Sequence, residues 1–261
     1  LTTVNGLYGI DLLSISKDSY NNIWIGGKSP FGFVQIYDNE KNSIDVFDYG
    51  LTEITKFFIG DSIALASFVD GQDLGLIKWI YSNYQWSYRD IYRNFPFLIE
   101  SINGVEILNQ HIFLGTDSGL LVGYLGENLK DPNNWELVSN DYSSPIDAMR
   151  STENGFTFIS NQTIYSVIDY NDTFQYEQLE VQIPVEFSDF LIDEEDFICG
   201  IHNKKVYSQR NNFNPISTGK ILYYIELDSQ GNLIIGSDLG LIEINRNSYV
   251  LKYHIPNSPA T

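Results

Sequence analysis

Hydrophobic and polar residues alternate in short runs along almost the whole chain, and polar residues that favour turns separate the runs. The apolar positions are rich in Ile, Val, Phe, Tyr and Trp, and Asn, Asp and Gly bound them. Such alternation is typical of half-buried β-strands joined by tight turns. No long stretch places apolar residues at i, i+3, i+4 and i+7, so we expect little helix. The pattern predicts an all-β protein.

One phrase occurs near both ends of the chain. Residues 18–26 read DSYNNIWIG and residues 228–236 read DSQGNLIIG, each a turn followed by a short apolar strand that ends on a small residue. Degenerate copies lie between them. The six small residues are Gly26, Ala66, Gly115, Ser160, Gly200 and Gly236. Neighbouring members are between 36 residues (Gly200 to Gly236) and 49 residues (Ala66 to Gly115) apart. A period in this range indicates a solenoid or a propeller.

Each repeat holds four short apolar runs, which is the blade pattern of a β-propeller. We predict an all-β propeller of about six four-stranded antiparallel blades that forms a single domain over residues 1–261. The predicted blades are residues 8–50, 51–95, 96–142, 143–182, 183–218 and 219–258. The alternative is part of a seven-bladed propeller, because the chain begins at Leu1 and its last residues look like the start of another repeat. We therefore expect it to be a fragment of a longer parent chain.

The last repeat, residues 228–241, reads DSQGNLIIGSDLGL and resembles the repeat of two-component-regulator propellers. That repeat usually carries Asp, Gly and Asn, then Leu-Trp-Ile-Gly-Thr and Gly-Leu. The first repeat resembles it too, because Trp24 stands where the family repeat has its Trp. The other four repeats keep only the order of turn, apolar strand and small residue. Such propellers occur in extracytoplasmic sensor domains of hybrid histidine kinases and in secreted proteins associated with type IX secretion. The resemblance implies a binding role in a periplasmic, cell-surface or secreted bacterial protein, and it carries no catalytic residues.

The chain is strongly acidic, with 34 Asp and Glu against 15 Lys and Arg and a net charge of −19. Nucleic acids are poor partners for such a surface, because phosphates are bound by Lys and Arg. The simplest consequence of the charge is solubility, and the alternative is binding of a cation or a basic partner. No transmembrane run is present, so we expect no direct membrane insertion. The single cysteine, Cys199, lies in an apolar strand and is expected to be buried and structural.

Three carboxylates stand near the start of predicted innermost strands: Asp11, Asp147 and Glu186. In a propeller these strands line the central channel, and their starts lie at the face where ligands bind. The three residues are therefore candidate ligand-binding residues at the channel mouth, where an acidic funnel would take a basic group or Ca²⁺. The alternative is that they are paired with cations of the chain or hydrated. No cofactor other than Ca²⁺ is suggested.

Other candidate chemistry is weaker. The three histidines lack metal-ligand spacing, and no nucleophile elbow or phosphate-binding loop is present. The acidic run at residues 193–196 fits a hairpin turn better than a calcium loop, whose ligands alternate around a glycine. A set of aromatics in the second repeat favours packing between blades, with a platform for sugars or peptides as the alternative. These are Tyr81, Tyr84, Trp86, Tyr88 and Tyr92.

These observations favour a noncatalytic propeller of a bacterial envelope or secreted protein that binds a protein, peptide or glycan through loops on one face. One alternative is an extracytoplasmic sensor domain of a hybrid two-component kinase. Another is a propeller hydrolase or lyase, because a fold by itself does not choose a function. No catalytic residue is assigned, and an enzyme is the less favoured reading.

Overall fold

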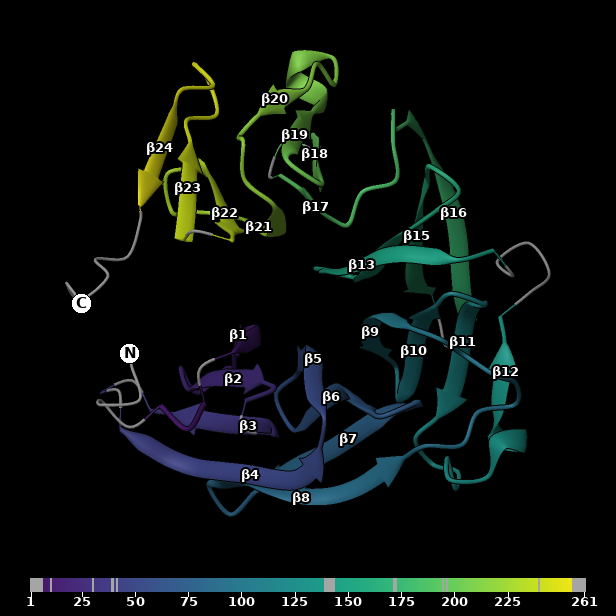
Figure 1. Ribbon diagram of the computed structural model, residues 1–261. Coiled ribbons are helices and arrows are strands. Elements are labelled where there is room, and N and C mark those ends of the chain that lie inside the picture. Colours follow the sequence, from purple (N-terminus) through teal and green to yellow (C-terminus); the bar gives the residue numbers. More distant parts are fainter. Residues whose placement is uncertain are drawn as a thin grey trace. The chain divides into compact units, whose positions relative to one another are not determined.

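The computed structural model describes residues 7–9, 11–29, 31–38, 40, 42–138, 144–170, 173–193, 195, 197–238 and 240–254 (Figure 1). The contacts of the chain divide it into two compact units, Leu1–Pro145 and Ile146–Thr261. Over the described residues, each unit contains three four-stranded antiparallel sheets. In every sheet the strands pair in chain order, so each sheet is a meander.

The first unit contains strands β1 to β12, in three sheets of four. The bounds are β1 Leu12–Lys17, β2 Ile23–Gly27, β3 Gly32–Tyr37, β4 Ser43–Leu51, β5 Glu53–Ile59, β6 Ile63–Asp70, β7 Asp73–Ser82, β8 Gln85–Tyr92, β9 Ile102–Leu108, β10 His111–Thr116, β11 Gly119–Tyr124 and β12 Trp135–Leu137. The first strands of neighbouring sheets, β1, β5 and β9, contact one another in sequence.

The second unit contains strands β13 to β24. The bounds are β13 Ile146–Thr152, β14 Gly155–Ser160, β15 Thr163–Tyr170, β16 Thr173–Gln182, β17 Asp189–Ile192, β18 Ile198–His202, β19 Lys205–Ser208, β20 Ile216–Ser217, β21 Leu222–Leu227, β22 Leu233–Ser237, β23 Gly240–Ile244 and β24 Leu251–His254. Here β17 contacts β13 on one side and β21 on the other. Helix in the described parts amounts to two short 3₁₀ segments, Pro132–Asn134 and Gln209–Asn211.

Asparagine-led turns set several of the hairpins. The loops 83–84, 109–110 and 161–162 each contain two residues with positive φ, and each begins with Asn. Two consecutive residues in this left-handed region match the right-handed twist of the flanking strands, and Asn tolerates that conformation. The turns therefore follow from local sequence and fix the register of the strands they join.

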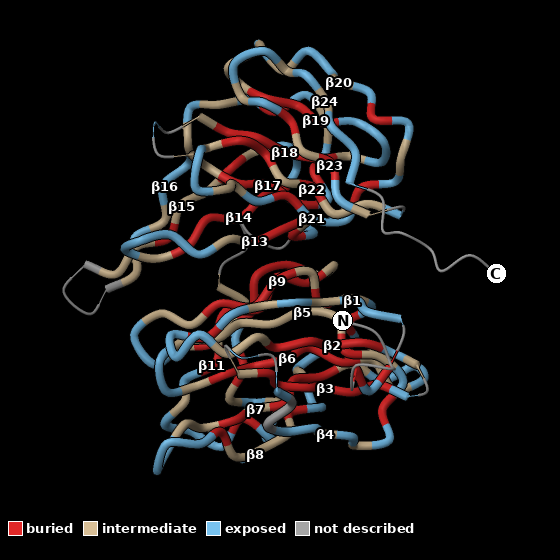
Figure 2. The backbone as a smooth tube through the Cα atoms, turned by 90° about the vertical axis from the view of Figure 1, so that its left-hand side faces the viewer, coloured by how far each residue is buried: buried red, intermediate tan, exposed pale blue. Residues whose placement is uncertain are grey.

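The hydrophobic cores lie between successive sheets of a unit, where buried positions concentrate on the middle strands (Figure 2). In the first unit, Trp24 and Ile36 of the first sheet pack with Ile54, Ala66 and Trp79 of the second. A similar core joins the second and third sheets. In the second unit, one core joins the first and second sheets and another joins the second and third. Within each unit, successive sheets thus bury the faces that they share, as the alternating pattern predicts.

The six small residues of the repeat all lie on the second strand of their sheets. At Gly26 a Cβ would come within 2.7 Å of Ile54 in the next sheet, and at Gly200 it would overlap the ring of Phe187. Gly236 has more room, since the nearest neighbour of an added Cβ would be the Cβ of Tyr224 at 3.7 Å. Crowding therefore explains Gly26 and Gly200 but not Gly236.

The prediction of an all-β chain with six four-stranded antiparallel blades and scarce helix is confirmed. One strand was placed wrongly: the innermost strand that was expected to begin near Glu186 comprises only Asp189–Ile192 in the structure. Pro184 has no N–H to donate to a ladder, and pairing with β18 extends only as far as Asp189 and Ile201. That the six sheets form a single domain stays a prediction.

Candidate functional site

The three predicted site residues take different positions relative to the strands. Asp147 is the second residue of β13, as expected. Asp11 is exposed and directly precedes β1. Glu186 lies in the loop before β17, so its placement on an innermost strand was wrong. Asp147 and Glu186 belong to the second unit and Asp11 to the first.

Asp147 and Glu186 are close enough to interact electrostatically. Burial, and to a lesser extent the charge of Glu186, together raise the pKa of Asp147 to about 6. The Oδ2 atom of Asp147 is buried and has no hydrogen-bond partner within the described part of the chain. A buried carboxylate oxygen without a donor is costly, and a second carboxylate nearby adds to that cost. A cation or a proton bound at Asp147 and Glu186 would therefore stabilise the pair.

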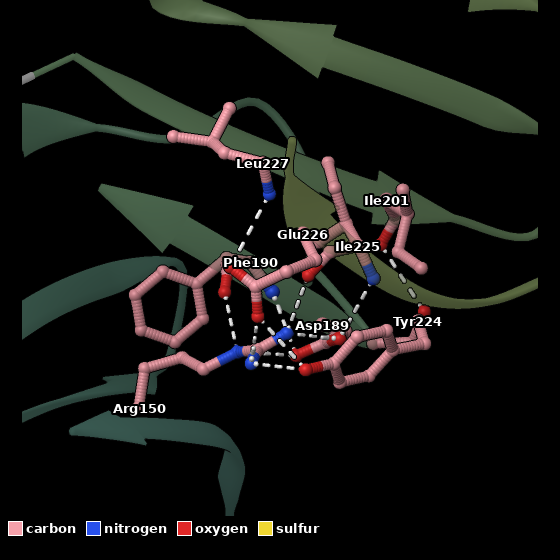
Figure 3. Close-up of polar contacts among 9 residues, drawn as sticks. Arg150, Asp189, Phe190, Ile201, Tyr224, Ile225, Glu226 and Leu227 are labelled. Atoms are coloured by element: carbon pink, nitrogen blue, oxygen red, sulfur yellow. Dashed lines mark hydrogen bonds and ion pairs between the residues drawn. The ribbon is translucent and has the colours of Figure 1, made fainter. Parts of the chain in front are cut away.

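A second polar cluster joins the first strands of all three sheets in the second unit (Figure 3). Arg150 of β13 donates from Nη2 to Oδ2 of Asp189 at 2.7 Å and to the carbonyl oxygen of Ile225 at 2.6 Å. Its Nε donates to the other oxygen of Asp189 at 3.1 Å and to the carbonyl oxygen of Phe190 at 2.8 Å. The side chain therefore ties β13 to β17 and β21.

The remaining nitrogen of Arg150 points to the exposed end of this cluster. Nη1 donates to the hydroxyl of Tyr224 at 3.2 Å and lies 3.4 Å from Oε2 of Glu226. The guanidinium also stands over the ring of Tyr224, 4.5 Å from its centroid. Burial alone would lower the pKa of Arg150, but the charge of Asp189 and contacts with Tyr224 and Glu226 raise it above its usual value.

Every nitrogen of the Arg150 guanidinium is therefore engaged, and Asp189, with 5% of its surface exposed, has its charge balanced. Such an arrangement fixes three strands relative to one another. It leaves Arg150 with no free donor to balance Asp147 and Glu186. The sequence reasoning missed this cluster. The sequence does contain one indication of this cluster: Arg150 is an arginine on a predicted innermost strand of a strongly acidic chain.

The acidic run at 193–196 is a turn in which Asp193 is bound by the chain itself. Asp193 accepts from the backbone N–H groups of Glu195 and Phe197 and from Arg210 at 2.6 Å. Burial opposes the effect, but these donors lower the pKa of Asp193. Residues 194 and 196 lie outside the described residues. Among the described residues, no three His, Cys, Asp or Glu side chains are grouped so as to hold a metal ion.

The aromatic set of the second repeat divides into core and surface residues. Trp86 and Tyr92 are buried in the cores between sheets, as the favoured interpretation predicts, whereas Tyr84 is 95% exposed. The expectation also missed Tyr20 from the β1–β2 turn, which stacks on Tyr81 with ring centroids 3.9 Å apart. Only tertiary structure brings these two rings together, because they come from different sheets.

Cys199 is a buried free thiol that donates to the hydroxyl oxygen of Ser208 at 3.4 Å, and burial raises its pKa. A raised pKa keeps a thiol protonated and unreactive, in line with a structural role. In the part of the chain that the structure describes, no helix is long and apolar enough to cross a membrane.

The six meander sheets, stacked through their faces within each unit, define the β-propeller class of fold. No family model and no curated protein matches the sequence. Similar solved structures include the extracellular domain of the putative one-component system BT4673 from B. thetaiotaomicron. Its TM-score is 0.65 at 16% identity, over 96% of this chain and 34% of that one.

Two further structures of different background share the fold. PorZ, an essential bacterial surface component of the type-IX secretion system of Porphyromonas gingivalis, aligns with a TM-score of 0.62 at 14% identity, over 100% of this chain and 34% of that one. A putative 6-phosphogluconolactonase from Bacteroides fragilis aligns with a TM-score of 0.59 at 8% identity, over 91% of this chain and 81% of that one. At these identities the likeness shows the fold alone. The chain spans about a third of the length of BT4673 and PorZ.

Proposed function

We propose that this chain is a noncatalytic, ligand-binding propeller of a bacterial envelope or secreted protein, and that it binds a positively charged group at Asp147 and Glu186. The observation that carries the proposal is the buried, unpartnered Oδ2 of Asp147 beside the charge of Glu186. The nearby cation on the same strand, Arg150, is already committed to Asp189, Tyr224 and Glu226. A ligand with an ammonium group would supply the missing donor and charge.

The envelope setting is supported by the proteins that share the fold. The matching part of BT4673 is its extracellular domain, and PorZ is a surface component of a secretion system. The repeat motif at the last blade resembles propellers from the same setting. A protein or peptide with an exposed lysine fits both the acidic net charge and the carboxylate pair. Calcium is the competing ligand at the same two residues.

A sensor role is the second candidate function. One solved structure with a TM-score of 0.65 is described as the extracellular domain of a putative hybrid two-component system. In that case ligand binding at Asp147 would change the activity of a kinase domain elsewhere in the parent chain. The expected outcome is a change in autophosphorylation of the full-length parent when the ligand is added, and no change in the D147N/E186Q parent.

Calorimetric titration tests the binding site directly. The protein is titrated with a short blocked lysine peptide, its norleucine analogue and CaCl₂, and the D147N/E186Q variant is compared with the control E153Q. Glu153 is an exposed carboxylate in the β13–β14 turn of the same unit. We expect lysine-peptide binding that weakens about tenfold or more in D147N/E186Q but not in E153Q. Binding should also weaken as pH falls through about 6, the pKa of Asp147.

Three results would contradict the proposal. The first is equal binding of the lysine and norleucine peptides, which would show that charge is not recognised. The second is equal loss in E153Q, which would show a response to overall acidity. The third is binding of Ca²⁺ alone, lost in D147N/E186Q, which would replace the peptide by a metal ion.

A further inference from the structure

Three exposed or half-buried tyrosines of the first unit gather at one end of its first two sheets. We call Tyr20, Tyr81 and Tyr84 the tyrosine patch. Tyr20 lies in the β1–β2 turn, Tyr81 near the end of β7 and Tyr84 at the tip of the β7–β8 hairpin. The rings of Tyr20 and Tyr81 stack with centroids 3.9 Å apart and an interplanar angle of 21°. Tyr20 is 42% exposed and Tyr84 is 95% exposed.

The stacked pair is held in place from several sides. The hydroxyl of Tyr20 donates to the carbonyl oxygen of Asp61 at 3.0 Å, and its backbone N–H donates to Asp18 at 3.0 Å. The backbone N–H of Tyr81 donates to the carbonyl oxygen of Ser62 at 2.9 Å. The Tyr81 ring also contacts Trp86, with centroids 5.2 Å apart. The rings are therefore ordered before any ligand arrives, which lowers the entropic cost of binding.

Tyr84 occupies a position that stability alone does not favour. Its φ is 64°, directly after Asn83 with φ 52°, so it is the second residue of a two-residue turn that prefers glycine there. A non-glycine residue in the left-handed region costs about 1 kcal/mol. With 95% of its surface exposed, the ring recovers almost nothing by burial. Gln110 and Gln162 adopt the same conformation at the equivalent turn positions, so the distinguishing feature of Tyr84 is a large aromatic ring held in solvent at the tip of a hairpin.

The electrostatic surroundings of the patch are negative. Asp18 is 4% exposed, and its carboxylate accepts hydrogen bonds from N–H groups of Tyr20, Asn22, Trp24 and Trp86, none of them a cation. Burial raises the pKa of Tyr81, and Tyr20, Asp18 and Tyr84 add to the rise, so these groups lie within electrostatic reach of its hydroxyl. Asp61, whose backbone carbonyl accepts from the Tyr20 hydroxyl, is exposed, and no cation of the described residues is paired with it.

Elsewhere in the chain, an arginine side chain covers an aromatic ring and pairs with a nearby carboxylate. Arg93 stands 4.8 Å from the centroid of Phe68 and pairs with Asp70. Arg150 stands over Tyr224 and pairs with Asp189 and Glu226.

The third case is Arg210, which lies 4.1 Å from the centroid of Phe197 and pairs with Asp193. In all three, a guanidinium covers an aromatic face and a carboxylate balances its charge. The tyrosine patch and Asp61 provide the ring and the carboxylate, and no arginine of the described residues is paired with them.

We propose that the tyrosine patch binds an arginine side chain of a basic peptide or protein, with the guanidinium on the Tyr20 and Tyr84 rings and paired to Asp61. The charge complementarity with a chain of net charge −19 favours this partner over a neutral glycan. The patch lies at the opposite end of β1 from Asp11 and in a different unit from Asp147. It therefore stands independently of the carboxylate pair in the proposed function.

The experiment uses the full chain carrying D147N/E186Q, so that the carboxylate pair contributes nothing. A short blocked arginine–glycine–serine peptide is titrated by calorimetry at about 50 mM and about 500 mM salt. The same titration is made with its lysine and citrulline analogues and with a neutral oligosaccharide. Patch variants are Y20A, Y84A and D61N. The controls are Y124A, a 41% exposed tyrosine on β11, and E127Q, an exposed carboxylate of the same unit.

We expect the arginine peptide to bind best, and each patch variant to weaken its binding about tenfold while the controls change it less than twofold. Binding should weaken at high salt, because the Asp61 pair is exposed. Equal binding of the citrulline peptide, equal loss in Y124A or E127Q, or no binding by the parent protein would overturn the proposal. Oligosaccharide binding that disappears in Y84A would overturn it in favour of a glycan. Near-ultraviolet circular dichroism of each variant confirms that the fold is retained.

Discussion

The indole N–H of Trp86 donates a hydrogen bond to Oδ2 of Asp18 at 2.9 Å, and thereby joins the first two sheets of the first unit. Asp18 lies in the β1–β2 turn and Trp86 on β8. The same carboxylate accepts from the indole N–H of Trp24 at 3.2 Å and from the backbone N–H groups of Tyr20 and Asn22. A turn residue of the repeat motif is thus also a contact between sheets.

Replacing Asp18 by Ala should destabilise the protein by about 3–5 kcal/mol, because two buried indole N–H groups and two turn N–H groups lose their acceptor. The matched control is Asp228→Ala at the equivalent turn of the last sheet. Asp228 accepts from N–H groups of its own turn, including those of Gln230 and Asn232, and from no indole of the described residues, so about 1 kcal/mol is expected there. Urea denaturation of both variants checks the difference. Equal losses would show that the indole contacts add nothing.

Arg150→Met should cost about 3–5 kcal/mol, since it leaves the buried Asp189 carboxylate without its cation. Adding Asp189→Asn should recover part of the loss, because the amide oxygen still accepts from the N–H of Ile225 without a charge. Arg93→Met is the control, as its pair with Asp70 is exposed and should contribute less than about 1 kcal/mol. Equal losses of stability for Arg150→Met and Arg93→Met in thermal or chemical denaturation would show that burial does not make the Arg150 pair more important than an exposed one.

The small residues of the repeat are predicted to tolerate a methyl group unequally. Gly200→Ala should destabilise by about 2–4 kcal/mol, because the new Cβ would overlap the ring of Phe187. Gly236→Ala should change stability by less than about 1 kcal/mol, since its nearest neighbour would lie 3.7 Å away. Denaturation midpoints of the two variants test this. A tolerated Gly200→Ala would show that the Phe187 ring, in the loop before β17, can move aside.

Asp147 should make stability depend on pH in the direction opposite to an ordinary ion-paired carboxylate. Its folded pKa of about 6 lies above the unfolded value, so its favourable contribution is complete below the unfolded pKa and is lost as pH rises through about 6. Asp147→Asn should therefore stabilise the protein by about 1 kcal/mol near pH 8, after allowance for solvent screening, and by almost nothing near pH 4.

Urea titrations at both pH values, with Glu153→Gln as the exposed control, measure the pH effect. A constant difference between wild type and Asp147→Asn at the two pH values would contradict the assigned titration. Stabilisation together with loss of lysine-peptide binding would indicate that the carboxylate is retained for its ligand at a cost in stability.

Much of the fold was predictable because its determinants are local. The alternation of Ile, Val, Phe and Tyr with polar residues follows the period of a strand, and Asn at positions such as 83, 109 and 161 marks two-residue turns. The spacing of the small residues then gives the number of sheets. The limits of β17 were wrong because the end of a strand depends on its pairing partner, here β18, and pairing is not a local property.

The site was less predictable, for a reason visible in particular residues. The sequence by itself determined an acidic all-β repeat protein, with Asp147 near the start of a first strand and Asp18 in a turn. Only the tertiary structure decided that the charge of Glu186 reaches Asp147, that Tyr20 stacks on Tyr81, and that Arg150 reaches Asp189 and Glu226. Each of these interactions joins residues from different repeats of the chain. Strand period and turn chemistry specify one sheet at a time, whereas packing between sheets decides which side chains meet.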